Sequence, residues 1–408
     1  MLCALCPEPF TFIFLLLSFV FYLEIMRKRE FIKYGGLLAG AMITGNSKIF
    51  SNDSEIKPNS VHLKGATLKL KFMPYDLQLK HVFTISSNSR TSTPVVLTEI
   101  EYDGVKGYGE ASMPPYLGES HETALKFLAQ VNLAQFKDPF LLEDILLYVD
   151  KITPGNYAAK ASVDIALHDL LGKLIGKPWY QLWGLDPAKT PNTSFTIGID
   201  TPEVVRQKVA EAAPYKVLKV KLGSATDKEM INTIRTVSDK PICVDVNQGW
   251  KDKNYALEMA NWLKDKNVVF IEQPMPKTQA DDIGWLTQNS PLPIIADEAM
   301  QTIEDLMNIK GLYSGVNIKL MKCGGMNAAY KIALMALAMN MKVMIGCMTE
   351  TSCAISAAAQ LSPLAKWADL DGNLLINNDC YDGVTVLDGK IILKDRPGIG
   401  IKERLKVW

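Results

Sequence analysis

Three acidic residues stand at the ends of short apolar segments in the second half of the chain. Asp245, Glu272 and Asp297 each follow such a segment, and about one strand–helix repeat separates each from the next. Three hard oxygen ligands suit an octahedral Mg²⁺ that keeps positions open for substrate and water. A single carboxylate at such a place can be an ordinary surface group, but a triplet in phase with a repeat predicts a magnesium site.

Lysines occupy equivalent positions on other segments of the same repeat. The segment "KVLKVKLG", residues 216–223, carries Lys219 and Lys221, and Lys319 ends a later segment. Strand alternation puts Lys219 and Lys221 on one face, and buried ammonium groups need carboxylate partners. Taken alone, the segment also fits an edge strand whose lysines reach into solvent. With the acidic triplet, we expect the charges of Lys219 and the metal to make Lys221 a proton acceptor at neutral pH.

These groups together could move a proton at a carbon next to a carboxylate. Lys221 and Lys319 come from segments on opposite sides of the repeat, so a substrate carboxylate on the metal would have one lysine on each face. The metal would stabilise the negative charge that develops when the α-proton leaves. The pattern therefore predicts proton abstraction and return at an α-carbon.

The elements that must position these side chains form an eightfold repeat. Eight short segments rich in β-branched residues alternate with helical patterns, at 193–199, 216–222, 241–246, 268–273, 293–298, 316–321, 342–346 and 367–372. This alternation predicts a (β/α)₈ TIM-type barrel with the polar residues at its carboxyl-terminal rim. An open doubly wound sheet is the alternative, but no GxGxxG motif follows the first segment.

Composition and the N-terminus limit the setting of this chemistry. The 408 residues carry 44 basic and 44 acidic side chains, which favours a small-molecule substrate and gives no indication of nucleic-acid binding. Residues 1–60 combine an apolar run, the basic "MRKREFIK" and a polar linker, so we expect a signal or anchor segment. With Lys28 in place of the first arginine it is twin-arginine-like, which predicts translation from Met26 and export to the periplasm; a single membrane anchor is the alternative. For the oligomeric state, the sequence leaves a homo-oligomer as an alternative to a monomer.

Several motifs, in order along the chain, resemble those of the enolase superfamily. They are "KVKLG", "VDVNQGW", "FIEQP", "IADE", "NIKLMKCGG" and "DLDG", and they look most like the muconate-lactonizing subgroup and its dipeptide epimerases. "GYGEA" and "DRPGIGI" extend the resemblance from about residue 64 to the C-terminus. The resemblance implies an α+β N-terminal capping domain over residues 61–185, completed by 375–408, and a barrel over 186–374.

The resemblance also implies a role for each candidate residue. Asp245, Glu272 and Asp297 would bind one Mg²⁺, supported by Asn247 and Glu298, while Lys221 and Lys319 would exchange the α-proton of a dipeptide; Lys219 and Thr196 would line the pocket. Asp369 and Asp371 would receive the free α-ammonium of the substrate, a task for which two carboxylates are well suited. The alternative for this pair is a turn or a helix cap.

Substrate choice depends on residues that depart from the family pattern. Arg90 is a candidate for holding the side-chain carboxylate of a glutamate, but it lies about three positions from the place where the family carries that arginine. Cys347 and Thr349 also differ from glutamate-specific members, which changes the pocket. We therefore expect a dipeptide of alanine with a small second residue, such as Ala-Ala, with L-Ala-D/L-Glu epimerisation as the alternative; cell-wall peptides would supply either.

Other functions on the same frame predict different features. Cycloisomerisation or o-succinylbenzoate synthesis would use the same lysines and metal but would not need the pair at 369 and 371. Sugar-acid dehydration usually needs a histidine from a late strand, and all four histidines precede the barrel. A non-catalytic periplasmic binding protein would tolerate loss of Lys221 or Lys319, and both are present.

Overall fold

The computed structural model describes residues 66–85, 88–113 and 118–408, all within one compact unit. The predicted leader and linker, residues 1–60, lie outside the described residues. Within the described part of the chain, no helix combines the length and the apolar character needed to cross a bilayer.

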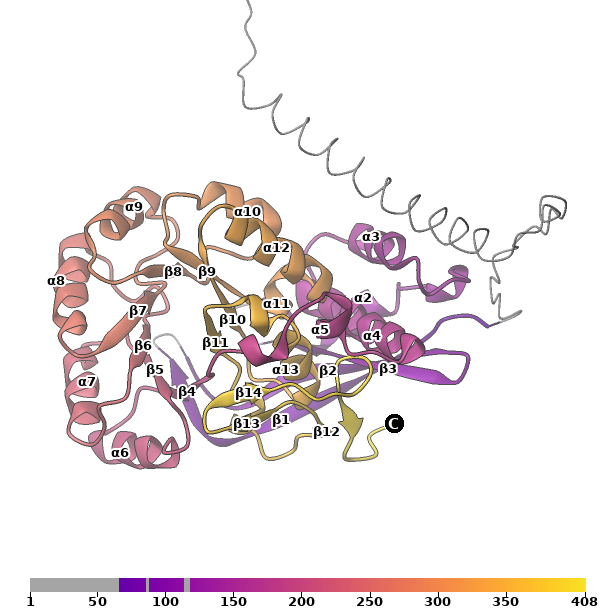
Figure 1. The fold of residues 1–408 in the computed structure, drawn as a ribbon, viewed down its shortest axis with the longest axis horizontal. Helices are drawn as coiled ribbons and strands as arrows, with labels where there is room; N and C mark the ends of the chain where they lie inside the picture. Colours follow the sequence, from indigo (N-terminus) through magenta and orange to yellow (C-terminus); the bar gives the residue numbers. More distant parts are fainter. Residues whose placement is uncertain (1–65, 86–87, 114–117) are drawn as a thin grey trace, which may run out of the picture. The chain divides into compact units, whose positions relative to one another are not determined.

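The eight predicted segments form one parallel sheet, with neighbours in chain order (Figure 1). Its strands are β4 (Ser194–Ile197), β5 (Val217–Lys221), β6 (Ile242–Asp245), β7 (Val268–Glu272), β8 (Ile294–Ala296), β9 (Gly315–Ile318), β10 (Lys342–Gly346) and β11 (Trp367–Asp369). The helices between and after them are α6 (Pro202–Glu211), α7 (Asp227–Arg235), α8 (Lys253–Lys264), α9 (Ala280–Asn289), α10 (Ile303–Asn308), α11 (Leu320–Cys323), α12 (Met326–Ala338) and α13 (Ser352–Ala359). The barrel prediction is confirmed.

The first and last strands meet and bring the sheet round into a barrel. Thr193 forms a parallel bridge with Ala368, and the Thr193 Oγ1 accepts a hydrogen bond from the Leu370 N–H at 2.8 Å. The neighbouring Ser194 Oγ donates to Asp369 Oδ1 at 2.6 Å. These contacts connect β4 to β11, which an open sheet would leave as two separate edges.

The prediction for the sixth segment was wrong at its end. We expected a strand over 316–321, but β9 stops at Ile318, and Lys319 caps a single helical turn, α11. The segment 367–372 is also shorter as a strand, since β11 ends at Asp369 and a 3₁₀ turn begins at Gly372. At both places the chain leaves the sheet at the barrel rim, where functional side chains need irregular backbone.

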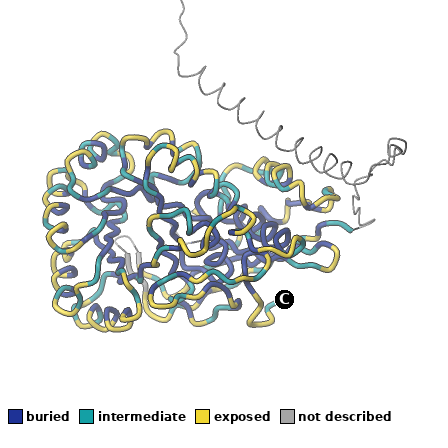
Figure 2. Tube along the Cα trace, in the orientation of Figure 1, coloured by how far each residue is buried: buried dark blue, intermediate teal, exposed yellow. Residues whose placement is uncertain are grey.

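The barrel interior is filled by side chains rather than open. Strands are buried and the outward surfaces of the surrounding helices are exposed (Figure 2). Cys243, Phe270, Ile295 and Met344 form a packed layer inside the barrel. Packed layers of this kind are typical of TIM barrels and leave only the carboxyl-terminal end free for chemistry.

The N-terminal part is an antiparallel sheet covered by helices. Its strands are β1 (Lys69–Ile85), β2 (Asn88–Tyr102) and β3 (Val105–Ser112), and its helices are α2 (His121–Leu128), α3 (Leu142–Ile152) and α4 (Tyr157–Ile175). Helix α4 is buried around most of its circumference, because it packs against this sheet and also contacts α11 and α12 of the barrel. Gly109 on β3 permits the close approach, since a Cβ there would overlap the Ser162 carbonyl.

The C-terminal segment returns to this N-terminal sheet. It contains the short strands β12 (Tyr381–Asp382), β13 (Thr385–Leu387), β14 (Lys390–Ile392) and β15 (Lys402–Glu403), and a short helix α5 (Trp179–Leu182) links α4 to the barrel. Asn377 N–H donates to Gln78 O at 2.9 Å, and Ile399 N–H donates to Asp169 Oδ1 of α4 at 3.1 Å. The exact domain boundaries given above stay a prediction.

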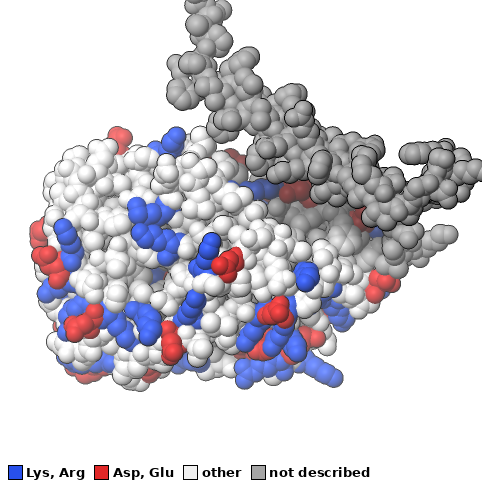
Figure 3. All heavy atoms as spheres, viewed as in Figure 1, with Lys and Arg blue, Asp and Glu red and all other residues white. Residues whose placement is uncertain are grey.

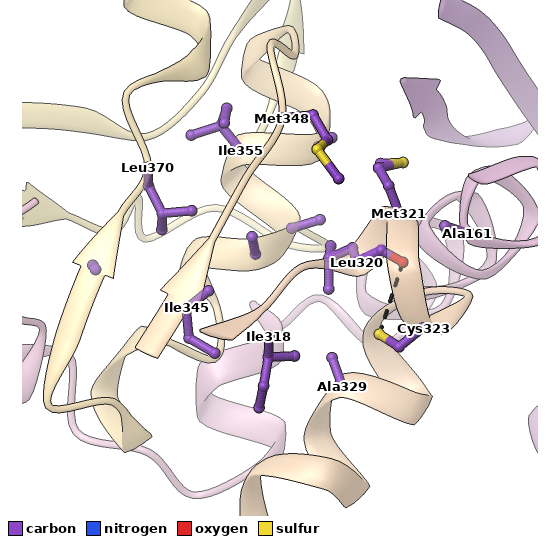
Figure 4. Close-up of a cluster of buried hydrophobic side chains, with 14 of the residues drawn as sticks. Ala161, Ile318, Leu320, Met321, Cys323, Ala329, Ile345, Met348, Ile355 and Leu370 are labelled. Carbon is purple, nitrogen blue, oxygen red and sulfur yellow. Dashed lines mark hydrogen bonds between the residues drawn. The ribbon is translucent and has the colours of Figure 1, made fainter. Parts of the chain in front are cut away.

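The turn α11 is anchored in the hydrophobic core between the barrel and α4. Leu320, Met321 and Cys323 lie in one buried cluster with Ala161 of α4 and Met348 (Figure 4).

On the surface, basic and acidic side chains are interspersed over the face shown in Figure 3.

Candidate active site

The predicted site residues come together at the carboxyl-terminal rim of the barrel. A cavity of about 60 Å³ is lined by Arg90, Thr196, Lys219, Lys221, Asn247, Lys319, Cys347, Met348, Thr349, Asp369, Asp371 and Leu375. Residues as far apart as Arg90 on β2 and Asp371 after β11 therefore share one chamber. A second cavity of about 300 Å³ adjoins it, because Thr196 and Leu375 line both.

The three acidic residues form a compact buried cluster beside this cavity. Asp245 ends β6, Glu272 ends β7, and Asp297 directly follows β8. Each offers a carboxylate oxygen that lies within 4.8 Å of the other two. Buried oxygens at this spacing fit a single hard cation, which would also relieve the mutual repulsion of the acids.

The backbone turns sharply just beyond two of these acids. Asn247 has φ of 45° and Gln273 has φ of 36°, both in the left-handed region that non-glycine residues seldom adopt. The Gln273 side chain secures the turn, because its Oε1 accepts hydrogen bonds from the N–H groups of Asp297 at 3.0 Å and Ala299 at 3.1 Å. Strained backbone held this firmly is common at functional sites.

Lys219 and Lys221 both point into the cluster, as strand alternation predicted. Their Nζ atoms lie 3.1 Å and 2.7 Å from the same oxygen, Asp245 Oδ2. Burial opposes ionisation of Asp245, but Lys221 and Lys219 outweigh it and lower the pKa of Asp245 to about 2. Burial would also lower the pKa of Lys219, yet the carboxylates around it, led by Asp369 and Glu272, raise that pKa and keep Lys219 charged.

Lys319 approaches the acids from the other side. Its Nζ lies 2.7 Å from Asp297 Oδ2. Because β5 and β9 flank the strands β6, β7 and β8 in the sheet, Lys221 and Lys319 reach the acidic cluster from its two ends. That the two lysines face opposite sides of a bound substrate stays a prediction.

A fourth lysine, Lys322, was missed by the sequence analysis. Its Nζ lies 2.5 Å from Asp297 Oδ1 and is 3% exposed. In a strand, Lys319 and Lys322 would point to opposite faces, but in the turn α11 they are three residues apart and share one side. The signal that could have found it is the "KLMKCGG" spacing, in which Gly324 at φ of 89° ends a helical turn.

Asp369 and Asp371 have different partners. Asp369 Oδ2 accepts from Lys219 Nζ at 2.7 Å, whereas Asp371 Oδ2 accepts from the Thr196 N–H at 2.7 Å. Burial and the neighbouring Asp369 raise the pKa of Asp371 to about 7. Asp371 precedes a 3₁₀ turn but its side chain does not cap it, which removes the helix-cap alternative.

Further polar residues form hydrogen bonds with the carboxylates of the cluster or with one another beside it. Asn247 Nδ2 donates to Glu298 Oε1 at 3.2 Å, and its N–H donates to Asp245 Oδ1 at 3.1 Å. Glu298 Oε2 is buried and has no hydrogen-bond partner among the described residues, as expected of an oxygen beside a cation site. Asn317 of β9, also absent from the predictions, donates from Nδ2 to Glu272 Oε1 at 2.7 Å.

The residues that depart from the family pattern lie on one wall of the cavity. Arg90 Nη2 donates to Thr349 Oγ1 at 3.2 Å, and Cys347 lies two residues before Thr349 on the same wall. Arg90 is thus directed at the chamber although its position along the sequence is displaced.

Comparison with known proteins agrees with this fold. Residues 202–406 match the family described as enolase C-terminal domain-like, and residues 70–184 match the mandelate racemase / muconate lactonizing enzyme N-terminal domain. The chain belongs to this family, the enolase superfamily.

Two curated relatives and one solved structure narrow the class. The chain is 58% identical to an L-Ala-D/L-Glu epimerase of Bacteroides thetaiotaomicron, over 92% of this chain and 98% of the relative. It is 41% identical to an L-Ala-D/L-amino acid epimerase of Pedosphaera parvula, over 83% of this chain and 100% of the relative. The structure of a dipeptide epimerase from Enterococcus faecalis V583, complexed with Mg and L-Leu-L-Tyr, is 32% identical with a TM-score of 0.77, and the match covers 82% of this chain and 99% of that one.

These relations define the class of the protein. It is an isomerase of the dipeptide epimerase type with the barrel and capping fold of its superfamily. Mg²⁺ is its cofactor, and the carboxylate cluster described above fits that ion. The resemblance noted in the sequence is confirmed.

Proposed function

We propose that this chain interconverts L-Ala-L-Glu and L-Ala-D-Glu by moving the α-proton of the second residue between Lys221 and Lys319. The observation that carries the proposal is the approach of these two lysines to one carboxylate cluster from opposite ends, at 2.7 Å in each case. A single base could remove a proton and return it to one face only, so inversion needs a donor on the opposite face.

This chain's own carboxylates would hold the cofactor. Asp245, Glu272 and Asp297 would bind Mg²⁺, with Asn247 and Glu298 holding their orientation. When bound, the ion draws electron density from the substrate carboxylate and lowers the cost of negative charge at the α-carbon.

The proton transfer itself is carried out by the lysines. One lysine, as the neutral amine, takes the α-proton into its lone pair, and the other, as the ammonium, gives a proton to the opposite face of the carbon. The substrate loses one proton and gains one, so only its configuration changes. Lys219 stays charged, since three carboxylates surround it, and it adds positive charge next to the developing anion.

The two ends of the dipeptide have separate partners. Asp371 lines the cavity and would receive the α-ammonium of the alanine. Asp369 is engaged with Lys219 and Ser194, so its task in this proposal is to hold Lys219 rather than to share the substrate ammonium.

Glutamate is the second residue that the site supports best. The guanidinium of Arg90 lines the cavity and can pair with a side-chain carboxylate, and the relative at 58% identity is named for the glutamate dipeptide. The sequence alone favoured Ala-Ala, which stays a prediction. Arg90 already donates to Thr349 Oγ1 at 3.2 Å, so the glutamate proposal rests on the positive charge that its guanidinium brings to the cavity wall and on the name of that relative.

Exchange in heavy water tests this proposal. Protein with Mg²⁺ in D₂O is given L-Ala-L-Glu or L-Ala-L-Ala, and deuterium at the second α-carbon and the appearance of the other isomer are followed by NMR. We expect faster exchange with L-Ala-L-Glu, and we expect Arg90→Met to lower kcat/KM for that substrate while the exposed Arg206→Met does not. Exchange with neither dipeptide would refute the proposal, and faster exchange with Ala-Ala would restore the small-residue prediction.

We also propose that the protein is exported, on the basis of the twin-arginine-like segment in residues 26–44. Cell fractionation tests this with the full chain and with a variant in which Lys28 and Arg29 are both glutamine. The wild type should enter the periplasm and the variant should not. Equal distribution of the two would refute export through this signal.

A further inference from the structure

The turn α11 presents two lysines to one carboxylate. Lys319 and Lys322 are three residues apart in a helical turn, and their Nζ atoms contact different oxygens of Asp297, Oδ2 at 2.7 Å and Oδ1 at 2.5 Å. Lys319 lines the cavity. Lys322 is not among the described residues that line it.

All three donors of the Lys322 ammonium group are used inside the protein. They go to Asp297 Oδ1 at 2.5 Å, to the Asp297 carbonyl oxygen at 2.7 Å and to the Asn317 carbonyl oxygen at 3.0 Å. An ammonium group has three donors and no acceptor, so Lys322 has no proton left to offer a substrate. It joins the end of β8 to β9 and fixes both the backbone and the side chain of Asp297.

We infer that Lys322 is a positioning residue for the magnesium ligand Asp297. Lys322 occupies Oδ1, so Oδ2, which Lys319 contacts, is the oxygen that Asp297 would offer to the cation. The inference rests on the proposed roles of Asp297 and Lys319. Lys322 also connects two ligands, because Asn317, whose carbonyl it binds, donates from its side chain to Glu272.

The turn α11 has anchors other than Lys322. Leu320, Met321 and Cys323 anchor the turn in the hydrophobic cluster of Figure 4. After the turn, the Met326 N–H donates to Asp164 Oδ1 of α4 at 2.5 Å. A buried lysine in an already anchored turn is therefore best explained by its contacts with Asp297.

Magnesium affinity tests this inference without using the reaction. Lys322→Met keeps the length and apolar stem of the side chain but removes all three donors, and Mg²⁺ binding is measured by calorimetry on the full chain. We expect affinity to fall about 10- to 100-fold, the usual cost of losing a group that orients a metal ligand. Loss of a positive charge alone would act in the opposite direction and tighten cation binding, so the sign separates orientation from charge.

Lys160→Met is the matched control. Lys160 is also buried and pairs with one carboxylate, Asp150 Oδ1, at 2.7 Å. It lies on α4, and its ammonium group donates to Asp150 rather than to the proposed magnesium ligands. Its Mg²⁺ affinity should equal that of the wild type. Lys322→Gln, which keeps side-chain donors without the charge, should fall between Lys322→Met and the wild type.

The outcomes separate this inference from the proposed function. Circular dichroism shows which Lys322 variants are folded. If a folded variant binds Mg²⁺ as tightly as the wild type or more tightly, the inference is overturned, even if the wild type epimerises L-Ala-L-Glu. A wild type that binds Mg²⁺ but exchanges no dipeptide proton refutes the proposed function, while the positioning of Asp297 is still judged by the affinities.

Discussion

Replacing Glu350 by glutamine should make the protein more stable in alkali. Glu350 follows Thr349 of the cavity wall, is 1% exposed, and accepts a hydrogen bond from the Met348 N–H at 3.0 Å. Burial, and then the nearby carboxylate of Glu110, raise its pKa from 4.5 to about 8. Glutamine has the shape of the protonated acid and can still accept from Met348, but it never ionises.

The size and sign of the effect follow from this pKa. An acid whose pKa is higher in the folded protein than in the unfolded chain stabilises the fold fully below about pH 4.5, and that contribution is lost as the pH rises through about 8. Each pKa unit corresponds to about 1.4 kcal/mol, so a rise from 4.5 to about 8 makes the ionised form cost on the order of 5 kcal/mol at pH 9. Glu350→Gln should match the wild type at pH 5 and exceed its free energy of unfolding at pH 9 by up to that amount.

Urea denaturation at pH 5, 7 and 9, at a fixed Mg²⁺ concentration, measures this difference. Glu229→Gln, an exposed carboxylate on α7, is the control and should change the free energy of unfolding little at any of these pH values. The reasoning is refuted if Glu350→Gln differs from the wild type by the same amount at pH 5 and pH 9.

Three other perturbations test the site and the fold. Lys221→Met and Lys319→Met should each reduce the rate of epimerisation by about 100-fold or more, while each variant still exchanges the α-proton of one isomer with D₂O, as followed by NMR. If both folded variants lose α-proton exchange equally with the two isomers, the two lysines are not opposed bases. Asp371→Asn should raise KM for the dipeptide about 10-fold or more, measured by initial rates, and should leave the Mg²⁺ affinity measured by calorimetry unchanged. An unchanged KM would exclude contact between Asp371 and the substrate ammonium. Gly109→Ala should lower the free energy of unfolding by about 1–3 kcal/mol, since the new Cβ meets the Ser162 carbonyl, and urea denaturation that matches the wild type would contradict this packing.

Much of the barrel could be predicted because its signals are local and periodic. Each strand is a short apolar segment, and the residues that follow these segments meet at one rim in any parallel barrel. Asp245, Glu272 and Asp297 were therefore found from spacing, and the inward direction of Lys219 and Lys221 was found from strand alternation. These inferences needed no knowledge of which side chains touch.

The ends of strands and the choice of partners could not be predicted in the same way. β9 stops where the turn α11 begins, α11 packs on α4, and this turn brings Lys322 to Asp297, which lies 25 residues earlier in the chain. Sequence spacing also could not assign Asp369 to Lys219, since the two residues meet only when β11 closes against β4.

The sequence by itself determined the number of strands, the acids at their ends and the two lysines that flank them, because these depend on periodicities of two residues and of one strand–helix unit. Only the tertiary structure decided which lysine pairs with which carboxylate, how Arg90 reaches the chamber, and why the pKa of Glu110 rises to about 7 and that of Glu350 to about 8. The physical reason is that burial and distance set electrostatic energies, and both are properties of the packed molecule rather than of any segment.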